Sequence, residues 1–593
     1  MMETVRRFRS LISERLSRTL CAAALISLVM AIAFGAGDSF KIWFIRYLGY
    51  YCTASAFAGL LYYAWKICPR DRWTWPSPTL CLFGGLSVAL GLWINFIHSD
   101  PGFKIAMDEY VLASTARSLH ENREVFTVTR IFAEGNHFRP SEGYVDKRPW
   151  VYPFLVSILH DLRGYQLRHS FDVNTLLAAG FLTLSFISSY RMFGLWAGAL
   201  SVLLWSTLPL LMLSAGGGGM ELLGLGLLAL LIYACGRYLL KPSADGEALI
   251  SFCVLFLAYA RYELICFSIP ALIVICIGWH QAKRIYLSAG SLIALSLLLP
   301  LLFQIQFSLA SADAWKLSGD FNTAFALEHV GINLGHALAF FFSYDWSLAN
   351  SLFLSVFGFI ALVGLPFIVR RHWSRYRHSG SCLSGLIFLP FFGLHLLVIL
   401  GFHASRLDSP FVSRYSLIFH LFLVMAVLFL VDHLATMRKT AWKYAVATCL
   451  IYICAITMPK NAVSNFSERN FAIKEQAWLV GLSEHKFQER SLVVDRFTVP
   501  WSLRDWVAIP PHLALENASV IVNEVSSGRY PAIYLVERLE YRGEGEFTPT
   551  DPVFQQIAEA FAMDLIDEKS FRPFTLTRVH QIRTYQGVAG GSY

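Results

Sequence analysis

Residues 195–214 have the sequence LWAGALSVLLWSTLPLLMLS, twenty residues without a charged side chain. About 20 consecutive apolar residues form a helix long enough to cross the hydrocarbon core of a bilayer. The whole chain shares this character, since 55% of its 593 residues are hydrophobic and only 15% are charged. A soluble domain has roughly 45–50% apolar and about 25% charged residues. The composition therefore excludes a soluble enzyme, a disordered protein and a fibrous protein, and it predicts a polytopic membrane protein.

Similar apolar segments recur along the first 459 residues. We predict thirteen spans: 19–36, 43–66, 78–98, 173–191, 195–214, 220–240, 248–261, 262–280, 286–308, 348–369, 382–402, 415–432 and 443–459. The run 248–280 could form one span or two, because Arg261, Glu263 and Pro270 interrupt it. With thirteen spans and a cytoplasmic N-terminus, every inner loop contains Lys or Arg, as the positive-inside rule requires. A single helix at 248–280 would place the arginines of 370–377 outside, so two spans are favoured.

This topology leaves three long segments outside the membrane: 99–172, 309–347 and 460–593. Residues 460–593 contain 14 Lys and Arg against 17 Asp and Glu, a net charge of −3, whereas residues 1–459 have a net charge of +11. Strand-like runs at 491–497, 519–525, 532–539 and 574–585 alternate with helical patterns at 470–482 and 551–564. The predicted fold class is thus an α-helical polytopic membrane protein over 1–459, followed by a small extracytoplasmic α/β domain over 460–593.

Other classes of site find little support in the sequence. The eleven cysteines lie in or beside apolar runs and form no CxxC pair, so neither a disulfide framework nor a cysteine zinc site is expected. No zinc-finger spacing, aromatic-basic RNA motif or basic tail indicates a nucleic-acid partner. The Arg-rich N-terminus precedes an apolar run without a clear cleavage site, which predicts a retained first helix.

The first outer segment contains the most informative motif, Asp108-Glu109-Tyr110. Two carboxylates at the start of a helix, beside the mouth of a span, can face both water and a lipid headgroup. They can equally be a helix cap, because Asp is a favoured N-cap and Glu suits the first turn. Taken alone, the acidic pair is more typical of a helix cap than of a functional site.

Further along the same segment, Lys147 and Arg148 precede Pro149 and Trp150 where the chain returns to the membrane. Cations at an interface bind phosphates or anionic headgroups. They also snorkel from apolar surroundings without any ligand. The two interpretations carry equal weight here, because the positive-inside rule gives no reason for cations on the outer side.

Charged residues interrupt the apolar sequence at two places. Glu221 follows the glycines 216–219 at the outer start of a span, where a lipid-facing carboxylate is costly. The glycines form no phosphate loop, since no Lys-Ser/Thr follows them. Arg261 and Glu263 stand inside the run 248–280, where they either mark a site or pair with each other.

A last cluster surrounds the outer start of a late span and contains His403, Arg406, Asp408 and Arg414. Arginines on the outer side oppose the orientation bias, so an anionic ligand explains them better. His403 alone is typical of a hydrogen-bonded structural histidine.

These motifs, in this order, resemble the GT-C superfamily of membrane glycosyltransferases that use polyprenyl-phosphate sugars, above all its protein O-mannosyltransferases and lipid A aminoarabinose transferases. The family's acidic pair in the first outer loop is matched by Asp108-Glu109, and its Lys-Pro-Pro-like segment loosely by Lys147-Arg148-Pro149-Trp150. A later acidic residue is similar to Glu221, and an Arg-Tyr pair is matched by Arg414-Tyr415. Two extra spans before the acidic pair, a missing second proline and a C-terminal domain without motifs depart from the pattern.

The resemblance implies an enzyme that transfers a sugar, with inversion, from a polyprenyl-phosphate donor to a hydroxyl of a lipid, glycan or protein. Asp108 would be the base and Glu109 would position the acceptor or a metal. The implied donor-phosphate ligands are Lys147, Arg148, Arg406 and Arg414, and the implied sugar- or acceptor-positioning residues are Glu221, Tyr110, Arg261, Glu263 and His403.

A divalent metal ion is the one cofactor that the resemblance allows, with Asp108, Glu109 and Glu221 as candidate ligands. The expected location is the bacterial inner membrane, with membrane lipids around the spans. A transporter or flippase of lipid-linked sugars and a non-catalytic lipid-glycan binding protein are the competing interpretations. Intramembrane charges and Gly/Pro breaks also mark transporters, although the long outer segments favour the enzyme.

Overall fold

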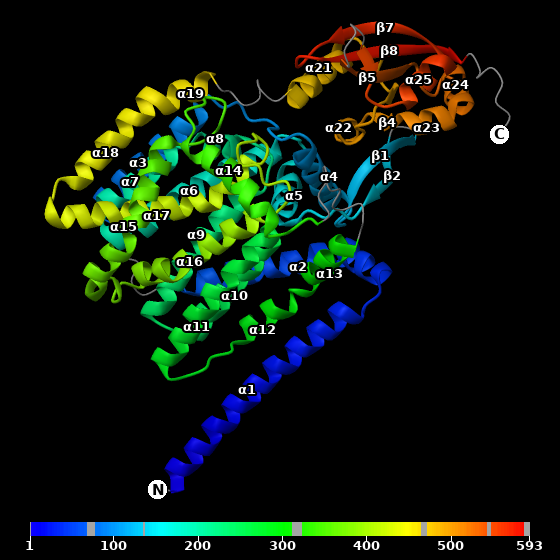
Figure 1. Cartoon of the computed structure of the whole chain (residues 1–593). Coiled ribbons are helices and arrows are strands. Elements are labelled where there is room, and N and C mark those ends of the chain that lie inside the picture. Colours follow the sequence, from blue (N-terminus) through cyan, green and yellow to red (C-terminus); the bar gives the residue numbers. More distant parts are fainter. Residues whose placement is uncertain are drawn as a thin grey trace.

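The computed structural model describes residues 2–67, 77–134, 137–310, 323–463, 471–541 and 547–585. Within these ranges most of the chain is helical, and Figure 1 shows a bundle of helices with a smaller sheet at one side, beside β1, β2 and α4. The predicted class, a helical membrane protein followed by a small C-terminal α/β region, is confirmed.

Nine helical segments in the described ranges are long and apolar enough to cross a bilayer. They are α3 (Pro78–Phe96), α6 (His169–Phe193), α9 (Glu221–Leu240), η1 (Tyr262–Phe267) with α11 (Ser268–Ala282), α12 (Ala289–Ser296) with α13 (Leu299–Ala310), α15 (Leu352–Tyr376), α16 (Gly380–Leu400), η2 (Ser413–Ser416) with α17 (Leu417–Met437), and α18 (Ala441–Tyr452) with η3 (Ile453–Thr457) and α19 (Met458–Val463).

Two bent pairs meet the same requirement only together. The chain bends by 114° between α1 (Met2–Gly35) and α2 (Asp38–Ile67), and by 78° between α7 (Leu195–Ser206) and α8 (Pro209–Gly216). The described residues therefore supply at most eleven spans, not the thirteen predicted. The count falls because 19–36 and 43–66 join in one bent pair, and because α10 (Ala244–Ala260) has 17 residues, fewer than the roughly 20 that a span needs.

The predicted break in the run 248–280 is confirmed. Arg261 is extended, with φ −157° and ψ 130°, so it ends α10 and separates it from η1. Paired charges inside an apolar run thus stop the helix where a continuous apolar sequence would have extended it.

The segment between α3 and α6 forms a compact layer at one end of the bundle. It contains α4 (Met107–Glu121), the antiparallel hairpin of β1 (Thr127–Glu134) and β2 (His137–Tyr144), and α5 (Val151–Arg163). The sequence analysis did not predict the hairpin. In the second segment predicted to lie outside the membrane, α14 (Glu328–Phe342) buries His329 and Asn333 while it exposes Ile332, Leu334 and Leu338.

The C-terminal region begins with α21 (Phe471–His485) and is built around a six-stranded sheet. The strand order is β4 (Val507–Ile509), β3 (Leu492–Val494), β5 (Ile533–Tyr541), β8 (Thr575–Tyr585) and β7 (Phe561–Lys569), and β6 (Phe547–Pro549) pairs with β5. Helices α22 (Val499–Ser502), α23 (Pro511–Glu516), α24 (Ala518–Ser526) and α25 (Val553–Ala560) connect the strands.

Two predictions for this region are wrong. Residues 519–525 form the helix α24 and not a strand, because Ala518 and Ile521, three positions apart, are buried together on one helix face. The helix predicted over 551–564 stops at Ala560 and continues as strand β7. A short apolar run fits either element, so sequence periodicity alone does not decide between them. The division at residue 459 falls within α19 and stays a prediction.

Candidate active site

The acidic pair lies at the first turn of α4, after an unusual backbone conformation. Ala106 has φ 60° and ψ −101°, a combination that is strained for a residue with a Cβ. The start of α4 has no side-chain cap, and Asp108 pairs with two arginines. The cap interpretation of Asp108 is therefore wrong.

Asp108 is held between two guanidinium groups. Its Oδ1 accepts from Arg148 Nε at 3.0 Å and Nη2 at 2.5 Å, and its Oδ2 accepts from Arg414 Nη2. Burial alone would raise the pKa of Asp108, but the attraction of Arg414 and Arg148 outweighs it and holds that pKa well below its usual value. The carboxylate is thus charged throughout the physiological pH range.

The charges continue on both sides of Asp108. Arg148 Nη1 donates to both oxygens of Asp146, at 2.9 and 3.0 Å. Arg414 Nη1 lies 2.9 Å from Glu221 Oε1, and Arg261 Nη1 approaches the same oxygen at 3.5 Å. Arg261 Nε also pairs with Glu263. Seven groups of alternating charge therefore form one network, which we call the charge chain: Asp146, Arg148, Asp108, Arg414, Glu221, Arg261 and Glu263.

Arg414 occupies the centre of the charge chain. The residue is 8% exposed, and its Nε has no hydrogen-bond partner among the described residues. A buried guanidinium N–H without a partner is costly, and it is a ready donor to an anion.

Glu109 has a different environment from Asp108. Its Oε2 accepts from the backbone N–H groups of Lys104 at 2.5 Å and Ile105 at 2.7 Å, and its Oε1 accepts from Gly218 N at 2.7 Å. Burial raises the pKa of Glu109 to about 7, although these three donors oppose the rise. The side chain therefore ties the start of α4 to the glycine loop 216–219.

The glycine loop needs its small residues for this approach. A Cβ on Gly217 would lie 3.0 Å from Glu109 Oε1, and one on Gly216 would lie 2.7 Å from Ser99 Oγ. Asn174 Nδ2 fixes the loop further by donating to the carbonyls of Gly217 and Gly219, both at 2.8 Å. The loop is thus a close backbone contact and not merely a flexible turn.

A small hollow of about 20 Å³ opens beside this arrangement. Its lining residues are Lys104, Ile105, Glu109, Leu210, Leu213, Ser214, Gly217, Gly219, Glu221, Pro410 and Arg414. Lys104 is a residue that the sequence analysis missed; its Nζ donates to Asp100 O at 2.7 Å, and burial lowers its pKa. Its position four residues before Asp108 was the available signal.

Besides Glu109, four predicted residues lie outside the charge chain. Arg406 is exposed and takes part in none of the ion pairs found among the described residues. His403 stacks edge-on against Phe402 and is bonded through its backbone to Ala324. Tyr110 packs against Phe103, with ring centroids 4.2 Å apart, and both belong to a separate buried cluster. Lys147 is next in sequence to Arg148 of the charge chain, and burial and the charge of Arg148 lower its pKa.

The suggested metal ligands do not form a metal site in the described part of the chain, where no group of three or more His, Cys, Asp or Glu side chains could hold an ion. Both oxygens of Asp108 are bound by arginines, and those of Glu109 by backbone N–H groups. The residues present therefore do not fit a metal in this arrangement.

No protein-family model matches the chain, and no curated protein matches it. Solved structures do. The apo crystal structure of ArnT from Cupriavidus metallidurans matches with 12% identity and a TM-score of 0.50, over 84% of this chain and 97% of that one. The same protein bound to undecaprenyl phosphate gives 11% identity and a TM-score of 0.49, over 84% and 98%.

An Archaeoglobus fulgidus oligosaccharyltransferase, in complex with zinc and sulfate, gives 11% identity and a TM-score of 0.42, over 79% of this chain and 72% of that one. At such identities the likeness to ArnT concerns the fold alone, and it agrees with the motif order found in the sequence. The chain therefore has a fold like that of ArnT over most of its length.

Proposed function

We propose that the protein is a membrane glycosyltransferase that moves a sugar from a polyprenyl-phosphate donor to an acceptor hydroxyl at the extracytoplasmic face. The observation that carries this proposal is the position of Asp108 between Arg148 and Arg414, beside a hollow in an ArnT-like fold. In this arrangement the carboxylate can act as a base, and the two cations can bind a phosphate. Such an enzyme needs these two functions next to each other.

The reaction follows from these groups. The acceptor oxygen attacks the anomeric carbon, its proton passes to Asp108, and the bond from that carbon to the phosphate oxygen breaks. The electron pair leaves with the polyprenyl phosphate, whose growing negative charge Arg148 and Arg414 stabilise. Attack opposite the leaving group inverts the anomeric carbon.

The resting pairing adds a condition to this scheme. Both arginines proposed to hold the phosphate are bound to Asp108 in the free protein. A donor phosphate competes for the same N–H groups and weakens the attraction that lowers the pKa of Asp108. Donor binding would therefore make Asp108 a stronger base at the moment when the sugar is in place.

Glu221 and Arg261 support this arrangement from the other side of Arg414. Glu221 fixes the guanidinium through Nη1, and Arg261 partly balances the charge of Glu221. We propose that these residues position Arg414, and that Glu109 positions α4 through the glycine loop. The sugar and the acceptor, whether lipid, glycan or protein, are open to direct assay.

The test uses the full chain in nanodiscs of bacterial lipids and, for uptake, in sealed vesicles of the same lipids, with radiolabelled polyprenyl-phosphate sugars and candidate acceptors. Label in the acceptor supports the enzyme. Donor binding without transfer supports a non-catalytic lipid-glycan binding protein, and uptake by sealed vesicles supports a transporter.

Asp108→Asn tests the base, because it keeps the shape of the side chain and removes the proton acceptor. Asp161→Asn is the matched control, since Asp161 pairs with Arg123 and His120 outside the hollow. We expect transfer to be lost in Asp108→Asn and kept in Asp161→Asn, with similar thermal unfolding. Transfer by Asp108→Asn at the wild-type rate would remove the base assignment.

A further inference from the structure

The C-terminal region contacts the helix that carries the acidic pair. Leu503, in the turn after α22, is 3% exposed and belongs to one buried cluster with Phe103, Ala106, Tyr110 and Phe171. The other buried members of that cluster all come from the first outer segment. The side chain of Leu503 therefore completes the apolar packing beneath the start of α4.

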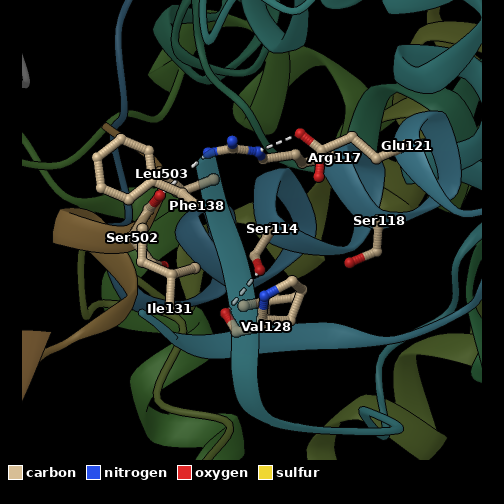
Figure 2. A pocket seen from close by; sticks show the side chains of 10 residues that line it. Ser114, Arg117, Ser118, Glu121, Val128, Ile131, Phe138, Ser502 and Leu503 are labelled. Atoms are coloured by element: carbon tan, nitrogen blue, oxygen red, sulfur yellow. Dashed lines mark hydrogen bonds and ion pairs between the residues drawn. The ribbon is translucent and has the colours of Figure 1, made fainter. Parts of the chain in front are cut away.

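Polar contacts surround this apolar anchor. Arg117 of α4 donates through Nη1 to Ser502 O at 3.1 Å and through Nη2 to Asp505 Oδ1 at 2.7 Å. Figure 2 shows this guanidinium between the backbone of Ser502 and the carboxylate of Glu121. Tyr165 OH donates to Leu503 O at 2.9 Å, so the turn is held from a second element.

A third interaction reaches the residue after the acidic pair. Tyr110 follows Glu109 directly; burial raises the pKa of Tyr110, and the nearby charge of Arg504 opposes that rise. Arg504 is fixed by its Nη1, which donates to Pro500 O at 2.8 Å. The turn 502–505 therefore meets α4 both near its start, at Tyr110, and near its middle, at Arg117.

The same turn is attached firmly to the sheet. Asp495, fully buried after β3, accepts from Trp501 Nε1 at 2.8 Å and from Arg538 Nη1 at 2.6 Å. Arg538 also donates to Glu475 of α21 at 2.9 Å. Through Asp495 and Trp501, the position of the sheet determines the position of the turn.

Backbone strain is present on both sides of this contact. Ala106, two residues before Asp108, has φ 60°, and Asp505 has φ 61°. Strained conformations of this kind persist where the surrounding structure holds them, and they concentrate at functional sites. Leu503 and Ala106 belong to the same buried cluster, and the packing of that cluster is part of what holds the conformation of Ala106.

We propose that the turn 502–505 is a positioning element for the acidic pair, and that Leu503 is its main residue. The inference rests on the proposed function. Leu503 touches no reacting group; it acts through Ala106 and Tyr110, whose packing sets where Asp108 points. Through this turn, the C-terminal region supports the position of the acidic pair.

The test compares two leucine truncations in the full-length protein in nanodiscs. Leu503→Ala removes the anchor, whereas Leu535→Ala removes an equal volume from the sheet core, away from α4. We expect kcat to fall about tenfold in Leu503→Ala, since a misplacement of about 1 Å costs up to about a hundredfold. KM for the donor should not change, because Arg148 and Arg414 stay in place. Leu503→Met should restore kcat, and Leu535→Ala should keep it.

Amide hydrogen exchange at residues 104–111 supplies a readout that does not need activity. We expect faster exchange there in Leu503→Ala and not in Leu535→Ala. An equal fall of kcat in both alanine variants, or an unchanged kcat in both, would overturn the positioning role while leaving the proposed function in place. If the wild type transfers no sugar, the proposed function fails and exchange alone decides: equal exchange in both variants then overturns the positioning role.

Discussion

Arg414→Lys is the substitution that tests the charge chain most sharply. The guanidinium reaches two carboxylates at once, Asp108 through Nη2 and Glu221 through Nη1. Lysine keeps the positive charge, but its single ammonium group cannot span both carboxylates with the geometry of a fork. One of the two acids then loses its closest cation in a buried site.

The size of the effect follows from this loss. Removing one partner of a buried ion pair costs about 3–5 kcal/mol of stability. We expect about 3 kcal/mol, the lower end, because Arg261 still lies 3.5 Å from Glu221. For activity, loss of one donor to the leaving phosphate is comparable to loss of an oxyanion donor, about a hundredfold in kcat, or ~2.7 kcal/mol.

The assay measures kcat and donor KM in nanodiscs, together with the midpoint of thermal unfolding. Arg375→Lys is the matched control, because Arg375 pairs at 3.0 Å with the buried Asp432 on α15 and α17, outside the site. We expect kcat to fall in Arg414→Lys alone. A wild-type kcat in Arg414→Lys, or an equal loss in Arg375→Lys, would refute the assignment of Arg414 to the leaving phosphate.

Three further predictions concern the residues around the charge chain. Gly217→Ala should lower transfer, because its Cβ would meet Glu109 Oε1 and Leu213 O at 3.0 Å. Gly180→Ala is the control and should be neutral, because a Cβ there would have nothing within 4 Å. Equal transfer rates in the two variants would contradict the close contact at Gly217. Because burial raises the pKa of Glu109 from 4.5 to about 7, the folded state binds this proton more tightly than the unfolded state. Stability should thus be full below pH about 4.5 and fall by roughly 3 kcal/mol as the pH rises through about 7. Thermal unfolding between pH 4 and 8 should show this slope in the wild type and lose it in Glu109→Gln, and parallel profiles would argue against it. Arg406→Ala should leave donor KM unchanged while Arg148→Ala raises it, since only Arg148 belongs to the charge chain; a higher KM in both would return Arg406 to the site.

Much of the charge chain could be predicted from the sequence, because charges are costly among apolar residues and therefore stand out there. Glu221 and Arg261 were selected on that ground, Arg148 and Arg414 as cations that the orientation rule does not explain, and Asp108 as part of an acidic pair at a helix start. The structure brings all five into one network. Their pairing across more than 300 positions was not predictable, since it depends on how the helices pack.

Other features gave weaker signals. Arg406 and His403 are close to Arg414 in the sequence, but in the structure they do not belong to the charge chain. The segment 519–525 has the composition of a strand and forms α24, because Ile521 faces the sheet core on one side of a helix. Leu503 gave no signal, since an apolar residue in a turn acquires its role only when the turn meets α4.

The central claim is that a donor phosphate lies between Arg148 and Arg414 and replaces Asp108 as their partner. Cryo-electron microscopy of the full chain in nanodiscs with polyprenyl phosphate tests it most directly. The account predicts phosphate oxygens about 3 Å from both guanidinium groups, with the carboxylate of Asp108 released toward the hollow. A phosphate bound elsewhere, with both Asp108–arginine pairs intact, would contradict it.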